Sequence, residues 1–296
     1  ATQVIDTVAA GGVIADGFID AYQQALVSDI EPAVKAQLLS LPTEDYLADI
    51  AANHGLVDVF AIRNAREAVK RLLATHFEQE WRTLYASMLS KREYQPTGEQ
   101  IGRRALRQIA LDYLGYTEKG SADQAHELLA SADNLTDRLA CLRQLLYRGG
   151  ADKAAAALAS FYEAWQHEAL IVNQWFSLQA MWSDAGTVDH VLQLQQHEAF
   201  DWRNPNKIRA LIGAFANGNP VGFHRKDGAG YTLLADAIIT LQSVNPQIAA
   251  RLCTPLTRYK RYAHGSGLMK AELQRIADVP DLSRDVFEVV ERSLSD

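Results

Sequence analysis

Hydrophobic residues recur along most of this chain at the three- and four-residue spacing of amphipathic helices. After Asp58 the pattern continues for some thirty positions, which predicts a long helix ending before the segment YQPTGEQ (94–100). The same pattern predicts further helices near 17–29, 32–40, 43–53, 97–114, 121–130, 134–147, 151–165, 169–182, 185–196, 205–216, 229–243, 246–262, 266–277 and 283–294. Alternation with period two, which indicates strands, is almost absent.

The boundaries of these segments carry residues typical of helix ends. Asn204-Pro205 and Asn245-Pro246 each place a capping side chain before a proline at the first helical position. Other candidate caps and helix ends are Asp133, Ser283, Gly149, Gly150 and Gly265. Short turns between many helices predict antiparallel neighbours. The sequence therefore predicts an all-α fold, an irregular solenoid or superhelix of antiparallel helix pairs resembling HEAT or armadillo arrays, without a fixed repeat period.

Composition narrows the class of protein. With 296 residues, 48% hydrophobic and 22% charged, the chain can bury a sizeable core. A net charge of −7 argues against a nucleic-acid partner, because such binding depends on lysine and arginine neutralising phosphates. Cys141 and Cys253 are too few for a disulfide scaffold, so we expect a reducing, cytoplasmic setting.

The apolar runs and the first residues of the chain bear on membrane insertion and secretion. No apolar run approaches the ~18 residues of a membrane-spanning helix, and we expect no membrane partner. The opening segment, ATQVIDTVAAGGV, lacks the charged and apolar regions of a signal peptide. It also lacks a starting methionine, which fits a piece of a longer chain.

One short segment resembles half of a zinc-peptidase motif. His126 and Glu127 would open H-E-x-x-H, but Ala130 stands where the second histidine is needed on the same helix face. Two other His-Glu pairs, at 167–168 and 197–198, also lack that histidine. We therefore expect neither a metal site nor catalytic residues in this chain.

Other candidate chemistry has a structural explanation. Cys141 and Cys253 could in principle serve a Cys-His pair, but both lie among apolar helix positions, which favours buried thiols. Asp227-Gly228 is typical of a turn before a helix rather than of a phosphate-binding loop. Four aromatic residues are expected to be core side chains, with a ligand platform as the alternative: Trp165, Trp175, Phe176 and Trp182.

The predicted helix near 246–262 carries two stripes of different character. The apolar stripe consists of Ile248, Leu252, Leu256 and Tyr259. The polar stripe consists of Gln247, Arg251, Thr254 and Arg258. The polar stripe is either an ordinary solvated face or a concave wall that contacts a peptide, because arginine offers planar, permanently charged donors to carbonyls and carboxylates.

Longer stretches resemble a known family. They are LSLPTEDYLADIA (39–51), REAVKRLLATHFEQEW, NLTDRLACL, NQWFSLQA and, most specifically, the block from NPNKIR to NPQIAARL (204–252). In the same order, these stretches resemble the C-terminal domain of aminopeptidase N of the Gram-negative type, within the gluzincin zinc aminopeptidases. The resemblance covers nearly the whole chain.

The resemblance implies that the catalytic residues belong to a different domain from this one. Family members carry zinc, a G-A-M-E-N segment and H-E-x-x-H in a separate catalytic domain, and neither motif occurs here. We therefore expect residues 1–296 to be a single helical C-terminal domain whose partners are the remaining domains of the same chain. In the family this domain closes over the active-site chamber and restricts access to it, so that short peptides enter and folded proteins do not.

The resemblance also suggests residues near the substrate. Gln247 and Arg251 match family positions along the substrate path, and Arg209 matches a basic position close by, so these three are candidate contacts to the distal part of a peptide. The alternative is an autonomous HEAT-like scaffold that binds protein or peptide partners and has no enzyme attached.

Overall fold

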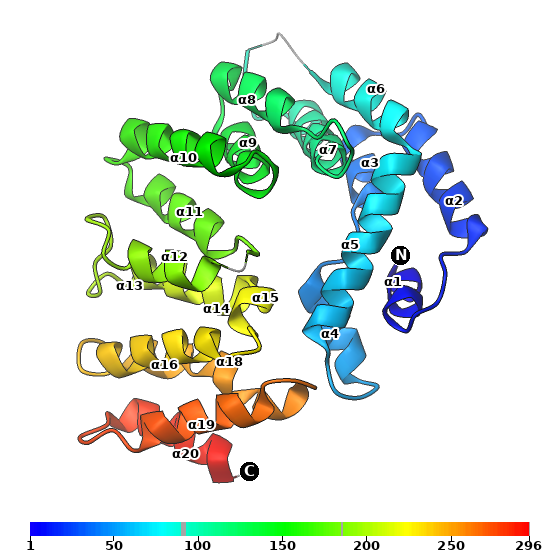
Figure 1. Cartoon of the computed structure of the whole chain (residues 1–296). Helices are drawn as coiled ribbons and strands as arrows, with labels where there is room; N and C mark the ends of the chain where they lie inside the picture. Colours follow the sequence, from blue (N-terminus) through cyan, green and yellow to red (C-terminus); the bar gives the residue numbers. More distant parts are fainter. Residues whose placement is uncertain (90–92, 185, 296) are drawn as a thin grey trace. The chain divides into compact units, whose positions relative to one another are not determined.

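The structure, a computed structural model, describes residues 1–89, 93–184 and 186–295, and helices dominate it (Figure 1). The α-helices are α1 (Thr2–Ala9), α2 (Asp16–Val27), α3 (Pro32–Leu39), α4 (Glu44–Ala52), α5 (Val59–His76), α6 (Glu78–Met88), α7 (Gly98–Leu114), α8 (Ala122–Ser131), α9 (Leu135–Arg148), α10 (Ala151–Trp165), α11 (Ala169–Ala180), α12 (Thr187–Leu194), α13 (Pro205–Ile208), α14 (Ala214–Gly218), α15 (Pro220–Phe223), α16 (Ala229–Leu241), α17 (Pro246–Leu252), α18 (Thr254–Thr257), α19 (Ser266–Ala277) and α20 (Arg284–Ser295). A π-helix η1 (Arg209–Gly213) and a 3₁₀-helix η2 (Tyr259–Arg261) complete the list.

The all-α prediction is confirmed, because the described residues contain no strand beyond an isolated parallel bridge between Val57 and Tyr262. Sequence periodicity missed α1 and the short α15. Residue 185, the first of the helix predicted near 185–196, lies outside the described residues, and α12 begins at Thr187. Within the described ranges, no helix combines the length and apolar character needed to cross a membrane.

The chain packs as two compact units. Unit 1 consists of residues 1–47 and 61–161, and unit 2 consists of residues 48–60 and 162–296. Each unit is therefore assembled from two separate stretches of sequence, and each buries its own set of apolar side chains.

Unit 1 is organised around α7, on which α3 and α6 pack, while α8 packs on α9. An aromatic cluster lies at its centre. The Trp81 and Tyr113 rings stack with centroids 4.2 Å apart and planes 5° from parallel. The hydroxyls of Tyr22 and Tyr113 both donate to the carbonyl oxygen of Leu39, at 2.7 and 3.1 Å. The end of α3 is thereby tied to α2 and α7.

The long helix predicted after Asp58 is divided at Phe77, where α5 ends and α6 begins. The backbone of Phe77 leaves the helical region (φ −111°, ψ 29°), and its side chain is buried. Trp81 Nε1 donates to the carbonyl oxygen of Leu73 (3.1 Å), which also accepts from the Phe77 amide. The bend places both aromatic rings in the core, a tertiary demand that periodicity does not record.

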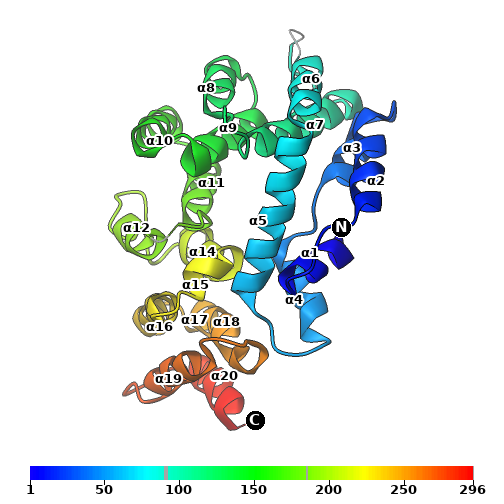
Figure 2. The ribbon, with the colours of Figure 1, turned by 45° about the vertical axis from the view of Figure 1, so that its right-hand side comes forward.

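Unit 2 consists largely of two rows of helices. Figure 2 shows α12, α16 and α19 stacked in one row and α11, α14, α17 and α20 in the other. Across and along the rows, α16 packs on α17 and α19, and α17 packs on α20. Residues 48–60 join this unit through Val57, whose amide donates to the carbonyl oxygen of Arg261 and whose oxygen accepts from the Ala263 amide, each at 2.9 Å.

Some predicted helix ends are confirmed and others are wrong. Asn204 and Asn245 cap α13 and α17 through their side-chain oxygens. At the start of α9 the cap is Asn134 rather than Asp133, whose carboxylate accepts from the Tyr94 amide instead. Gly149 and Gly150 follow the end of α9, as predicted. Ser283 does not cap a helix with its side chain, because its hydroxyl is buried and makes no hydrogen bond with described residues. Gly265 precedes α19 instead of ending a helix.

The start of α19 shows why a glycine stands at position 265. Its φ of +79° lies in the left-handed region, and a Cβ there would lie 2.1 Å from Tyr231 Oη. Tyr231 is buried and hydrogen bonded to His224 Nδ1 (2.8 Å), and the Tyr262 ring lies 4.1 Å from the His224 ring. Burial lowers the pKa of His224 to about 4.

Candidate functional site

The N-terminal end of α17 is built as the sequence predicts. Asn245 Oδ1 accepts from the Ile248 amide (3.1 Å), and Pro246 occupies the first helical position. The apolar stripe then packs inward, with Ile248 and Leu252 buried where α17 meets α16 and α20. Leu256 and Tyr259 are buried as well. One face of this segment is thereby committed to the core of unit 2.

The polar stripe lies on the other side. Gln247 and Arg251 are exposed and stand one helical turn apart on α17. Among the described residues, neither side chain makes an ion pair or a side-chain hydrogen bond. Thr254 and Arg258 are exposed too. The side chains of Gln247 and Arg251 are therefore available to a ligand.

The helix predicted over 246–262 is interrupted, which divides the polar stripe. α17 ends at Leu252, α18 begins at Thr254, and η2 follows from Tyr259. Pro255 is the second residue of α18 and has no amide hydrogen with which to continue the α17 ladder. Gln247 and Arg251 thus share one rigid helix, whereas Thr254 and Arg258 belong to α18 and its end.

Arg209 lies on a different element, the π-helix η1 between α13 and α14. Its Nη1 donates to Asn206 Oδ1 (3.2 Å), and the side chain is exposed. In the same turn, Ser177 Oγ of α11 donates to the carbonyl oxygen of Ala210 (2.9 Å). Short π-helical turns occur often at functional sites. The prediction of one continuous helix over 205–216 missed this turn, because a single widened turn leaves the apolar pattern almost unchanged.

The structure brings two of the three predicted residues together. Gln247 and Arg251 share a face of α17, while η1 packs on α11 and α14. Figure 2 places α14, which continues from η1, in the same row as α17. Arg209 is therefore in the same row of helices but not on the same helix.

The other candidate residues take structural positions. His126 and Glu127 are exposed on α8, and the described residues contain no cluster of three His, Cys, Asp or Glu that could hold a metal ion. Cys141 and Cys253 are buried, and burial raises the pKa of each thiol to about 12, so neither forms a thiolate at neutral pH.

The predicted aromatic core of 162–182 is confirmed in part. Trp175 and Phe176 are buried, while Trp165 and Trp182 are only partly covered.

The predicted turn at Asp227 is present, since its carboxylate accepts from the Ala229 amide (3.1 Å) directly before α16.

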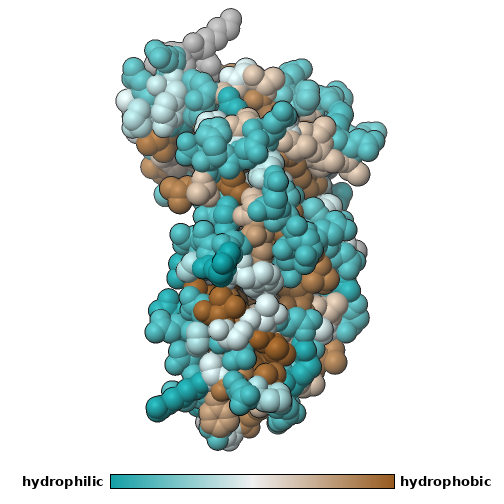
Figure 3. Space-filling view, turned by 90° about the vertical axis from the view of Figure 1, so that its left-hand side faces the viewer, coloured by the Kyte–Doolittle hydropathy of each residue, from teal (hydrophilic) through white to brown (hydrophobic). Residues whose placement is uncertain are grey.

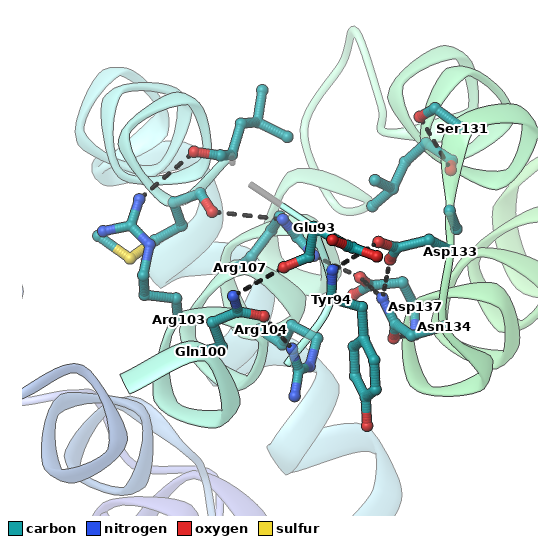
Figure 4. Close-up of a pocket in the computed structure, with 14 residues that line it drawn as sticks. Glu93, Tyr94, Gln100, Arg103, Arg104, Arg107, Ser131, Asp133, Asn134 and Asp137 are labelled. Carbon is teal, nitrogen blue, oxygen red and sulfur yellow. Dashed lines mark hydrogen bonds and ion pairs between the residues drawn. The ribbon is translucent and has the colours of Figure 1, made fainter. Parts of the chain in front are cut away.

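A pocket of about 540 Å³ lies in unit 1 between the end of α6, the first half of α7 and the α8–α9 turn (Figure 4). The arginines of α7 that line it are already bound to the protein. Arg103 Nη2 donates to the carbonyl oxygens of Ser87 (2.7 Å) and Leu89 (3.3 Å). Arg107 Nη1 donates to the carbonyl oxygen of Met88 (3.3 Å). These bonds satisfy carbonyls that the end of a helix leaves without partners.

The far wall of the pocket is a buried ion pair. Arg107 Nη2 binds the carboxylate of Asp137, and both side chains are more than nine-tenths buried. Asn134 Nδ2 donates to the same carboxylate (2.7 Å) while its oxygen caps α9. The pair and its neighbours thus fasten α6, α7 and α9 together, while Arg107 Nε and Asp137 Oδ1 are buried without a hydrogen-bond partner among the described residues. The exposed face of α17 is the better candidate for contact with a ligand.

The chain is similar to a described protein family and to several longer enzymes. Over residues 1–295 the chain matches the protein family described as "Domain of unknown function (DUF3458_C) ARM repeats". It is 38% identical to aminopeptidase N of Caulobacter vibrioides and 36% identical to aminopeptidase N of Escherichia coli, over 94% and 93% of this chain and 32% of each relative. The fold matches a crystal structure of Legionella pneumophila aminopeptidase A in complex with aspartic acid, with a TM-score of 0.89 and 26% identity, over 99% of this chain and 35% of that one. The chain spans about a third of the length of these relatives.

Proposed function

Because the chain belongs to this ARM-repeat family and its relatives include aminopeptidases N about three times its length, we propose that it is the helical C-terminal domain of a bacterial zinc aminopeptidase. The zinc ion and the catalytic residues then belong to the part of the parent enzyme outside residues 1–296. There, zinc would polarise the scissile carbonyl and activate water. The partners of this domain are the other domains of the same chain and short peptide substrates, with no role for nucleic acid or membrane.

The domain contributes shape and charge around the substrate. It closes over the active-site chamber and limits entry to short peptides with a free N-terminus. The all-helical solenoid-like fold supports this role, because stacked helices present an extended wall on which polar side chains can be arrayed. The two buried, unpaired cysteines support a cytoplasmic location for the parent.

The exposed polar face of α17 is the observation that carries the proposal. Gln247 and Arg251 are held on a capped helix whose other face is buried, so their positions are fixed while their polar groups stay available. Arginine binds carbonyl oxygens and carboxylates through a planar fork. We place these two residues, with Arg209, against the distal end of a bound peptide.

The test is Arg251→Ala in the parent enzyme. Loss of one charge-assisted contact worth about 1.4 kcal/mol should raise KM about tenfold for tripeptides and longer peptides. A one-residue anilide does not reach Arg251, so its kinetics should not change. Since the contact lies away from the reacting carbonyl, kcat should stay nearly constant.

A matched control is Arg284→Ala, which removes an exposed arginine of α20 that pairs with Glu288 instead of lining the α17 face. This variant should leave both substrates unaffected. Equal KM values for wild type and Arg251→Ala on long peptides would contradict the proposed role, as would a parent enzyme without peptidase activity.

A further inference from the structure

Helix α3 is apolar on both of its sides, which is unusual for a helix at a protein surface. Its sequence is PAVKAQLL. One side packs on α7, with Ala36 and Leu39 buried. The backbones of α3 and α7 lie close together, since a Cβ at Gly102 of α7 would lie 2.9 Å from the Ala33 backbone nitrogen. This side of α3 is therefore an ordinary core contact.

The opposite side of α3 is apolar and uncovered. The exposed fractions are 65% for Val27, 38% for Ile30, 49% for Val34 and 58% for Leu38. Val34 and Leu38 are four residues apart and share one face of α3, Ile30 lies in the link that leads into α3, and Val27 ends the adjoining α2. We refer to these four side chains as the α3 apolar face.

Charged groups are scarce in the stretch of chain that carries this face. Among the exposed residues of the stretch 21–40, only Asp29 and Glu31 are charged. The carboxylate of Glu31 is used to cap α3, accepting from the Val34 amide (3.1 Å). Lys35 turns inward, where its Nζ donates to the carbonyl oxygen of Ser28 (2.8 Å). Depletion of charge at the centre of an apolar area is typical of an interface core.

One other face of the molecule differs in this respect. The face in Figure 3 is largely hydrophilic, with hydrophobic residues showing in separate areas between hydrophilic ones. Isolated exposed apolar side chains are normal in soluble proteins. Around α3, by contrast, four exposed apolar residues occur between positions 27 and 38, from the end of α2 through the link into α3.

We propose that the α3 apolar face docks against the part of the parent polypeptide that lies outside residues 1–296. This inference rests on the proposed function. The relatives are about three times the length of this chain, so most of the parent is available to cover the face. Four side chains make too small a contact to hold two separate molecules together. They suffice for a partner on the same chain, because covalent linkage raises its effective concentration into the millimolar range.

The experiment measures the accessibility of this face directly. Leu38→Cys is labelled with a maleimide both in the chain of residues 1–296 and in the parent enzyme, and the labelled peptide is quantified by mass spectrometry. Cys141 and Cys253 are fully buried and add no native background from this region. Labelling of Leu38→Cys should be at least tenfold slower in the parent than in the 296-residue chain. Arg284→Cys, at a side chain that is 88% exposed, is the control and should react at one rate in both.

Three outcomes would overturn the inference. Equal labelling rates at Leu38→Cys in the parent and in the shorter chain would show that the rest of the polypeptide leaves the face open. Labelling of the shorter chain that slows as its concentration rises would assign the face to a second copy. A parent that hydrolyses peptides, yet labels rapidly at Leu38→Cys, would refute the docking surface and leave the proposed function intact.

Discussion

Replacing Gly265 by alanine should destabilise unit 2 severely. The residue stands before α19 with φ +79°, and an alanine Cβ would lie 2.1 Å from Tyr231 Oη and 2.9 Å from Tyr231 Cζ. The left-handed conformation alone costs a non-glycine residue about 1 kcal/mol. Relief of the overlap requires Tyr231 to move, which breaks its hydrogen bond to His224 inside a buried cluster at a cost of about 1–3 kcal/mol. The expected loss is therefore about 2–4 kcal/mol.

Urea unfolding followed by tryptophan fluorescence and by circular dichroism measures this loss. A matched control is Gly267→Ala two residues later, where an added Cβ meets no atom within 4 Å and should be neutral or slightly stabilising. In a Tyr231→Phe background the closest contact is gone, so Gly265→Ala should cost less than in the wild type. An unfolding midpoint for Gly265→Ala within error of that for Gly267→Ala would refute the packing argument.

Two further predictions concern buried charge. Burial lowers the pKa of His224 to about 4, compared with ~6.5 in the unfolded chain. Between these two pH values the unfolded chain binds more protons than the folded protein. The free energy of unfolding therefore falls as the pH falls through this window. Between pH 7 and pH 5.5, the wild type should lose about 1 kcal/mol more unfolding free energy than His224→Gln, and parallel pH profiles would contradict this. Asp137→Asn leaves Arg107 buried without its counter-ion and should cost about 3 kcal/mol in urea unfolding. The control Lys153→Ala, which breaks an exposed pair with Asp123, should cost less than about 1 kcal/mol, and similar values for both variants would show that burial is not decisive.

Local signals account for what the sequence predicted well. The cap at Asn245 and the apolar stripe of Ile248 and Leu252 depend only on neighbours within two turns, so periodicity and capping rules locate them. The same rules place Gln247 and Arg251 outside the core, but it was the resemblance to aminopeptidase N that made these two residues candidates for contact with a substrate.

Long-range contacts explain what the sequence did not reveal. The bend at Phe77 depends on the stacking of Trp81 on Tyr113, some thirty residues away along the chain. The buried pair of Arg107 and Asp137 joins two helices, and a pattern of apolar positions counts both residues as surface. For the candidate site, the sequence indicated which side chains are exposed. It could not indicate that Arg209 stands on a π-helix.

The pairing of residues 48–60 with the late residues of unit 2 affects the order in which the protein folds. Their partners, including Arg261 and Ala263, are made some two hundred residues later on the ribosome. Closing a flexible loop of that length costs about 5 kcal/mol in chain entropy. Prior folding of residues 61–161 into unit 1 shortens the free part of the loop and lowers that cost. Unit 1 should therefore fold while the ribosome is still at work, whereas residues 48–60 wait unpaired until nearly the whole chain has emerged.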